Sequence, residues 1–369
     1  MRYIGNKTRL LPFIARALDR LAIAPGSAHD AFAGTASVGR ALKQRGARVA
    51  SSDLMTYSYV FQRAYVVAQR APSFADLRAA DPELRRALRS ARFRRAVAAR
   101  GGGALHQVAE YLAKWVEPEP GFMVRHFSPD GGRMYFTAEN AARIDAVRAR
   151  LHEWRSKGLV GDDAYFVLLA ALLEGADRVA NTAGVYAAFI KSWQPNARRP
   201  LDLLVTAPVR GARGSTAHLG DAAVVAAEIG PVDLLYVDPP YNSRQYAGYY
   251  HVPEIIARGW FDERPVLRGK TGLPAGGAPR SAWCSARKVV PALDDLLAAT
   301  GARHVLVSYN SDGHLSEAAL RRSLAAAAVD GRVRRFTKAY KRYRADRERT
   351  NRTYRDDGLR ESLYYARLR

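Results

Sequence analysis

Four consecutive residues, Asp238-Pro239-Pro240-Tyr241, combine groups that could hold a planar ring bearing an amino group. The Asp238 carboxylate and the Pro239 carbonyl could accept hydrogen bonds from the amine. The ring of Tyr241 could stack on the planar group. The structural alternative is a proline turn with a capping aspartate. Taken alone, the four residues leave both interpretations open.

The residues just before this run predict the strand that would position it. Residues 232–237 are short, apolar and rich in β-formers, which is typical of a buried parallel strand. The two prolines would end that strand, because neither has an N–H to donate to a neighbour. We therefore expect Asp238 at the carboxyl edge of an α/β sheet, where such folds bind ligands.

A second candidate site element lies near the beginning of the chain. A strand over residues 28–32 leads into the small-residue loop 33–37, and then into a helix over residues 38–45. A glycine loop between a strand and a helix lets a ligand approach the backbone closely. This loop lacks the three-glycine spacing of dinucleotide sites, which favours a nucleoside-type ligand. The alternative is a simple strand–helix turn.

An acidic residue ends the next predicted strand. Residues 48–52 read as a strand, and Asp53 follows them. An acid at this place in a nucleotide-binding sheet commonly binds ribose hydroxyls. The alternative is a cap for the helix predicted over residues 57–70.

Alternating strands and helices predict a doubly wound α/β fold. A helix is expected over residues 10–21 and a core helix over residues 163–179. Further strands are expected near residues 217–221 and 304–308, with a last antiparallel strand over residues 361–367. Residues 269–279 contain four glycines and two prolines, which predicts a mobile loop.

Residues 71–158 differ in character from the rest of the chain. Residues 78–100 contain eight arginines and two acidic residues, and no strand–helix alternation is visible. We interpret residues 71–158 as an inserted, mainly helical module, and residues 1–70 and 159–369 as the main domain.

The charge of the chain favours a polyanionic partner. The formal net charge is +23, with 58 basic and 35 acidic residues. Residues 332–369 hold 14 basic and 5 acidic side chains, interleaved with Tyr340, Tyr343 and Tyr354. Nucleic acid is the first candidate for such a surface, and the alternative is a solvated basic tail.

Several other classes of protein are disfavoured. A single cysteine, Cys284, excludes an intramolecular disulfide and a cysteine-rich zinc site. No apolar signal segment is visible at the start, and residues 164–173, the longest apolar stretch, are too few to span a bilayer. We expect a cytoplasmic protein with no membrane partner.

Taken in order, these motifs resemble the D12 class of Dam-like, adenine-specific DNA N6-methyltransferases. The similarity rests on the segment from Tyr3 to Lys7, the loop from Phe32 to Gly34, Asp53, the inserted module and the run from Asp238 to Tyr241. Residues 220–222, 308–313 and 340–343 are also similar to the family. Ala36 and Ala31 depart from it, because the family more often has glycine and proline there.

The resemblance implies a Rossmann-like methyltransferase sheet, S-adenosylmethionine as the cofactor and no metal. It also implies the following cofactor-binding residues: Tyr3, Lys7, Asp30, Phe32, Gly34, Asp53 and Asp221. Asp53 would bind the ribose, Asp221 the adenine amine of the cofactor, and Tyr3 and Lys7 would close over it. The alternative for Lys7 is a contact with a DNA phosphate.

The implied activity is site-specific methylation of the N6 amine of adenine in duplex DNA. Asp238, Pro239, Pro240 and Tyr241 would be the catalytic residues, acting by direct in-line transfer on a base flipped out of the helix. A cognate restriction endonuclease and a bacterial, nucleoid-associated location would fit a restriction–modification role. The distance of Cys284 in sequence from the four residues favours a structural role for it over a covalent one.

Three alternative functions share some of these features. An RNA N6-adenine methyltransferase and a cytosine-N4 DNA methyltransferase would attack a similar exocyclic amine. A non-catalytic DNA-binding protein could retain the fold, although the intact run from Asp238 to Tyr241 argues against it.

Overall fold

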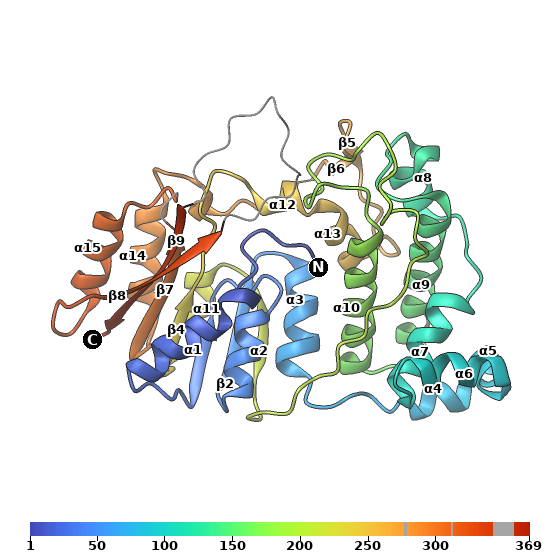
Figure 1. The fold of residues 1–369 in the computed structure, drawn as a ribbon, viewed down its shortest axis with the longest axis horizontal. Helices are drawn as coiled ribbons and strands as arrows, with labels where there is room; N and C mark the ends of the chain where they lie inside the picture. Colours follow the sequence, from blue (N-terminus) through green and yellow to red (C-terminus); the bar gives the residue numbers. More distant parts are fainter. Residues whose placement is uncertain (277–278, 311–312, 342–357) are drawn as a thin grey trace. The chain divides into compact units, whose positions relative to one another are not determined.

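A computed structural model describes residues 1–276, 279–310, 313–341 and 358–369 (Figure 1). The chain forms two compact units. The first contains Met1–Ile4, Arg63–Val209 and Gly248–Ala278; the second contains Gly5–Gln62, Arg210–Ala247 and Pro279–Arg369. The helix α12 (Tyr246–Tyr249) spans one of the boundaries between them.

The second unit is built on a seven-stranded sheet with the order β3-β2-β1-β4-β7-β9-β8. Its strands are β1 (Ser27–Asp30), β2 (Arg48–Asp53), β3 (Thr216–Leu219), β4 (Leu234–Val237), β7 (His304–Asn310), β8 (Arg334–Lys341) and β9 (Gly358–Arg367). The first five in the spatial order are parallel, and β9 runs antiparallel to both of its neighbours. The predicted doubly wound fold and its last antiparallel strand are confirmed.

Helices cover both faces of this sheet, as a parallel sheet requires. They are η1 (Thr8–Leu10), α1 (Leu11–Arg20), α2 (Ser37–Gln44), α3 (Thr56–Gln62), α11 (Ala222–Ile229), η4 (Ala282–Cys284), α14 (Val289–Ala299) and α15 (Glu317–Ala327). Leu235 and Val237 of β4 join one core cluster with α11, α14 and α15. Leu234 and Tyr236, which alternate with them, are also buried, and α1, α2 and α3 lie in front of the sheet in Figure 1.

The strand order places a topological switch between β1 and β4. The chain winds outward from β1 to β2 and β3, and then returns to add β4 on the other side of β1. Asp30 of β1 pairs in register with Tyr236 of β4, so that the two strands end at the same level. Ligands in such folds bind beyond the carboxyl ends of the strands at this point.

The first unit is mainly helical. Its elements are a π-helix (Arg63–Val67), α4 (Ala75–Ala80), α5 (Pro82–Arg89), α6 (Ala91–Ala99), α7 (Gly103–Lys114), α8 (Phe122–Phe127), η3 (Pro129–Gly131), α9 (Ala138–Ser156), α10 (Asp162–Val179) and α13 (His251–Arg258), with strands β5 (Leu267–Arg268) and β6 (Leu273–Pro274). The helical character predicted for residues 71–158 is confirmed, and α10 is the expected core helix. This unit extends beyond residues 71–158 on both sides, and a separate inserted domain with those boundaries stays a prediction.

The prediction of a mobile loop over residues 269–279 is wrong for the residues that the structure describes. Leu267 and Arg268 pair with Leu273 and Pro274 in a short antiparallel hairpin. Arg133 donates hydrogen bonds to the carbonyls of Gly269 and Lys270, each at 3.2 Å. Glycines suit the tight turn, where Gly269 and Gly272 have positive φ, and contacts from distant residues then hold it.

The basic C-terminal segment also contains an element that the sequence did not reveal. β8 pairs with β9 along its whole length and forms the edge of the sheet. Basic side chains on an edge strand discourage pairing with another chain, which explains how a charged segment can be a strand. Residues 342–357, with Tyr343 and Tyr354, and residues 311–312 lie outside the described residues.

Within the described residues, none of the helices combines the length and the apolar character needed to cross a lipid bilayer. This agrees with the reading of residues 164–173 as part of a core helix.

Candidate active site

Three aspartates lie at the carboxyl ends of neighbouring parallel strands in the second unit. Asp30 ends β1, Asp53 ends β2, and Asp238 directly follows β4. Burial raises the pKa of Asp30 to about 7, an effect that a hydrogen bond from Gly39 opposes and that the charges of Asp238 and Asp53 increase. Burial likewise raises the pKa values of Asp53 and Asp238. Such a concentration of buried carboxyls favours a cationic ligand.

The loop after β1 is held by two of these aspartates. The N–H of Gly34 donates to Asp53 Oδ2 at 2.9 Å, and the N–H of Gly39 donates to Asp30 Oδ2 at 2.8 Å. Ala36 has a φ of 57°, in the left-handed region that glycine adopts more readily. A glycine would adopt this backbone conformation more readily, so that Ala36 holds it at some cost in strain.

Phe32 lies at the start of this loop and packs on an aromatic neighbour. Its ring meets the ring of Trp283 edge to face, with centroids 4.9 Å apart. Trp283 is 3% exposed and belongs to the core cluster of α11 and α14. The sequence did not indicate Trp283 as a site residue, because nothing in its local pattern shows which distant loop it meets.

The neighbouring Cys284 is also buried, and its Sγ lies 3.3 Å from the carbonyl of Arg244. Burial raises the pKa of its thiol to about 11. The reactive form of a cysteine is the thiolate, so that these observations agree with a structural role for Cys284.

Asp238 lies in a small polar cluster that closes around one of its oxygens. The hydroxyl of Tyr241 donates to Asp238 Oδ1 at 2.6 Å, and Lys7 Nζ lies 3.0 Å from the same atom. Lys7 also donates to the Tyr241 hydroxyl. All of these contacts fall on Oδ1. In the part of the chain that the structure describes, Oδ2 is therefore available to another donor.

The ring of Tyr241 is fixed by its neighbours. The ring of Tyr309 on β7 meets it edge to face, with centroids 5.0 Å apart. The N–H of His314 donates to the carbonyl of Tyr241 at 2.9 Å. Tyr309 belongs to residues 308–313, one of the segments that are similar to the family. The prolines Pro239 and Pro240 take the chain from β4 to this ring without regular structure.

Lys7 reaches the cluster because the segment around it is tied to the glycine loop. The side chain of Asn6 donates to the hydroxyl of Thr35 at 3.1 Å, and accepts from the N–H of Thr8 at 2.8 Å. Lys7 is 3% exposed. A second acid, Glu361 on β9, lies 3.9 Å from Lys7 Nζ. Glu361 had no distinguishing signal in the sequence, because strand pairing decides which acid meets Lys7.

Asp221 and Tyr3 are placed differently from the other predicted residues. Asp221 is exposed and caps α11, accepting from the N–H of Ala223 at 2.9 Å. Tyr3 belongs to the first unit, where its ring stacks on Tyr250 with centroids 4.8 Å apart. The structure therefore gathers Lys7, Asp30, Phe32, Gly34, Asp53, Asp238 and Tyr241 within the second unit. Asp221 belongs to the same unit, where it caps a helix, and Tyr3 does not.

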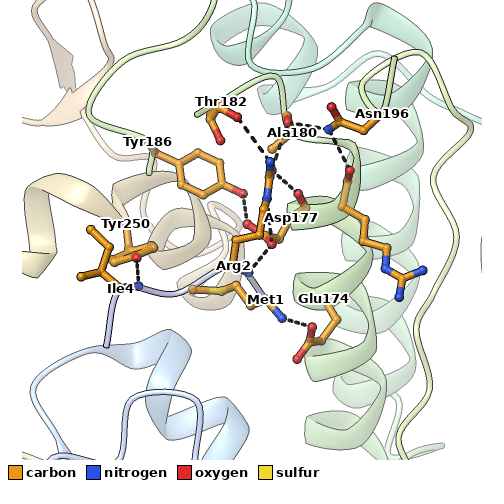
Figure 2. A network of polar contacts seen from close by, with 11 residues as sticks. Met1, Arg2, Ile4, Glu174, Asp177, Ala180, Thr182, Tyr186, Asn196 and Tyr250 are labelled. Atoms are coloured by element: carbon orange, nitrogen blue, oxygen red, sulfur yellow. Dashed lines mark hydrogen bonds and ion pairs between the residues drawn. The ribbon is translucent and has the colours of Figure 1, made fainter. Parts of the chain in front are cut away.

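A separate polar network holds the first four residues in the first unit (Figure 2). The backbone N–H of Arg2 donates to Asp177 Oδ2 at 2.5 Å, and the guanidinium donates to the carbonyls of Asp177, Ala180 and Thr182. The hydroxyl of Tyr186 donates to Asp177 Oδ1 at 3.3 Å. The amino group of Met1 pairs with Glu174.

The chain is similar to one protein family and to several individual proteins. A family model described as D12 class N6 adenine-specific DNA methyltransferase matches residues 3–275. The chain is 33% identical to Type II methyltransferase M.NlaIII of Neisseria lactamica, covering 99% of this chain and 98% of that protein.

Two further relatives match only in part. The chain is 30% identical to Type II methyltransferase M.FokI of Planomicrobium okeanokoites, over 94% of this chain and 50% of that protein. It is 39% identical to Type II methyltransferase M.CviAII of Paramecium bursaria Chlorella virus 1, over 54% of this chain and 57% of that protein. This chain thus spans nearly the whole of the first relative and about half of each of the other two.

Proposed function

We propose a residue-level mechanism for this chain, which belongs to the D12 class of N6 adenine-specific DNA methyltransferases. The chain methylates adenine in DNA, and its family implies the use of S-adenosylmethionine. The observation that carries the mechanism is the position of Asp238 directly after β4 at the switch point, with Tyr241 donating to its Oδ1.

In the proposed mechanism, Asp238 and Pro239 hold the amine of the target base. Oδ2 of Asp238 and the carbonyl of Pro239 accept hydrogen bonds from its two N–H groups, which draws the nitrogen lone pair out of conjugation with the ring. The carboxylate also stabilises the positive charge that develops on the nitrogen. Tyr241 stacks on the base, and Tyr309 and the Oδ1 hydrogen bond fix the orientation of its ring. Positioning of this kind supplies much of the catalysis.

The residues around β1 and β2 fit S-adenosylmethionine. Its sulfonium and ammonium charges suit the acidic strand ends at Asp30 and Asp53, whose carboxyls are buried. When bound, it supplies a methyl group already activated for transfer. We propose that Asp53 takes the ribose hydroxyls and that Phe32 and Gly34 line the pocket. Asp221, which is exposed on α11, would bind the adenine amine of the cofactor, and no metal is needed.

Tyr3 is also among the proposed cofactor residues. It stacks on Tyr250 in the first unit, and its predicted closure over the cofactor rests on the family resemblance alone.

Transfer to a base in duplex DNA requires the base to leave the stack, because N6 cannot be reached for reaction inside it. We propose duplex DNA as the substrate and base flipping as the route. Incubation with tritiated S-adenosylmethionine and duplex DNA, single-stranded DNA or RNA, followed by nucleoside analysis, tests this. N6-methyladenine from duplex DNA is expected. N4-methylcytosine, or N6-methyladenine formed in RNA alone, would contradict the proposal.

Arginines of the first unit are proposed to grip the DNA backbone. The following arginines of α5 and α6 are all exposed: Arg85, Arg86, Arg89, Arg92, Arg94 and Arg95. Each phosphate contact contributes about 0.9 to the slope of log affinity against log salt. Replacing Arg85, Arg89 and Arg92 by alanine is expected to lower this slope by about 2 to 3, while Arg322→Ala on α15 leaves it unchanged. An unaltered slope in the triple variant would remove α5 and α6 from the DNA interface.

We also propose that the chain is the modification enzyme of a bacterial restriction–modification system, acting on chromosomal DNA in the cytoplasm. The names of the relatives support this, since all three are called Type II methyltransferases. Modification-sensitive sequencing of DNA from cells that express the chain would reveal its site. Protection of that DNA from an endonuclease cutting the same site is the expected result.

A further inference from the structure

Glu361 is a buried acid next to the proposed catalytic residues, and the mechanism above leaves it without a role. It is 7% exposed, and its Oε1 lies 3.9 Å from Lys7 Nζ. Its Oε2 is also buried and has no hydrogen-bond partner among the described residues. Leaving a buried carboxylate oxygen unpaired is costly, so that this atom calls for a functional explanation.

The ammonium of Lys7 contacts the two side chains that the proposed reaction uses, Asp238 and Tyr241. Its ammonium lies 3.0 Å from Asp238 Oδ1 and donates to the hydroxyl of Tyr241. It lies 4.8 Å from the centroid of the Tyr241 ring. The hydrogen bond to the hydroxyl puts the ammonium at the oxygen end of the phenol. The ammonium also neutralises the carboxylate that would stabilise positive charge on the target nitrogen.

The cluster therefore contains one ammonium between two carboxylates. Burial raises the pKa values of Asp238 and Glu361, and Lys7 lowers both. Among the residues that the structure describes, the other titratable groups near Glu361 are the hydroxyls of Tyr236 and Tyr241, and Lys338 of β8, opposite in register. A positive charge arriving at Asp238 would repel Lys7, and Glu361 is the acceptor to which the ammonium could move.

We propose that Glu361 is a positioning residue that receives the Lys7 ammonium when the amine of the target adenine engages Asp238. The proposal rests on the proposed function of Asp238. In the resting enzyme Lys7 is shared between both acids and lies closer to Asp238. During transfer it pairs with Glu361 Oε2, and Asp238 is free to stabilise the charge on the nitrogen.

The variant Glu361→Gln tests this, because glutamine has nearly the same shape and lacks the charge. We expect the single-turnover rate constant for methylation to fall about tenfold, with the affinity for S-adenosylmethionine measured by calorimetry unchanged. Glu317→Gln on α15, whose carboxylate pairs with Arg321 in the same unit, is the matched control. Its rate constant is expected to equal that of the wild type.

A double-mutant cycle separates this role from a purely structural one. In the Lys7→Gln background no ammonium has to be received, so that adding Glu361→Gln should change the rate constant less than about twofold. An equal tenfold loss in both backgrounds would show that Glu361 acts independently of Lys7, and would overturn the proposal.

The wild-type enzyme offers a second measurement in case Glu361→Gln or Lys7→Gln does not fold. The chain has nine lysines, and labelling their ε-carbons with carbon-13 makes the Lys7 signal assignable by comparison with Lys7→Arg. The signal should shift when duplex DNA carrying the mapped site is added with S-adenosylhomocysteine. A signal that stays in place at saturating DNA would contradict the proposal.

Two measurements distinguish the proposed function from the role of Glu361. Wild-type protein that forms no N6-methyladenine would refute the proposed function itself. Wild-type activity together with an unchanged rate constant for Glu361→Gln would refute only the role of Glu361.

Discussion

The two units contain similar polar clusters with different properties. In the first unit Arg2, Asp177 and Tyr186 form a network in which both carboxylate oxygens accept hydrogen bonds. In the second unit Lys7, Asp238 and Tyr241 use the same three types of group: a cation from the N-terminal segment, a buried aspartate and a tyrosine hydroxyl that donates to it.

The difference lies in unused hydrogen-bonding capacity. Arg2 donates to three backbone carbonyls in addition to the Asp177 carboxylate, and a planar guanidinium suits several fixed acceptors. In the second cluster the contacts of Asp238 fall on Oδ1 alone, and Glu361 Oε2 has no partner among the described residues. A saturated network stabilises a fold, whereas an unsaturated one can accept a ligand.

The largest effect is expected from Asp238→Ala. Loss of the acceptor for the amine should lower the methylation rate constant about 1,000-fold or more. The affinity for S-adenosylmethionine, measured by calorimetry, should change by less than about threefold, which would be a difference of less than about 0.7 kcal/mol. Turnover close to that of the wild type would remove Asp238 from the mechanism and with it the contrast between the two clusters.

Asp177→Ala should produce the opposite pattern. It leaves the buried hydroxyl of Tyr186 and the donors of Arg2 without their acceptor, at a cost of about 3 kcal/mol in the free energy of unfolding. Activity per folded molecule should be retained. Urea denaturation measures the loss, and Asp163→Ala, an exposed acid on the same helix, should change stability by less than about 0.5 kcal/mol.

The pH dependence of the free energy of unfolding should show how much the buried carboxylate of Asp30 destabilises the fold. The folded-state pKa of Asp30 is about 7, above the usual value near 4 in an unfolded chain. Its contribution to stability is therefore fully present below pH ~4 and is lost as the pH rises through about 7.

Asp30→Asn does not titrate, so that its free energy of unfolding should rise by about 3 kcal/mol relative to that of the wild type between pH 4.5 and pH 8. Denaturant titrations at both pH values measure this difference. Parallel profiles for the two proteins would mean that Asp30 does not carry the pH dependence.

The smallest effect is expected from Arg2→Lys. Lysine keeps the charge but cannot donate to the several carbonyls at once, which should cost about 1 kcal/mol of stability. Arg20→Lys, an exposed change at the end of α1, should cost less than about 0.5 kcal/mol. If Arg2→Lys reduces turnover and leaves stability intact, Arg2 has a catalytic role and the proposed division of labour is wrong.

Much of the second unit could be predicted from the sequence because its signals are local. The apolar run before Asp238 and its proline stop predicted β4, and β-forming residues predicted β1, β2, β7 and β9. The glycine loop predicted the turn before α2. The sequence did not reveal β8, because basic residues on an edge strand resemble a solvated tail. It did not reveal the hairpin of β5 and β6, because contacts from Arg133 and His251, elsewhere in the chain, hold the turn.

The sequence by itself determined the fold class, the family and the order of the motifs along the chain. Only the tertiary structure decided which side chains meet. It placed Lys7 between Asp238 and Glu361, which are separated by more than a hundred residues, and it assigned Tyr3 and Lys7 to different units. The physical reason is that periodicity and turn chemistry act over a few residues, whereas strand order and register bring distant residues together.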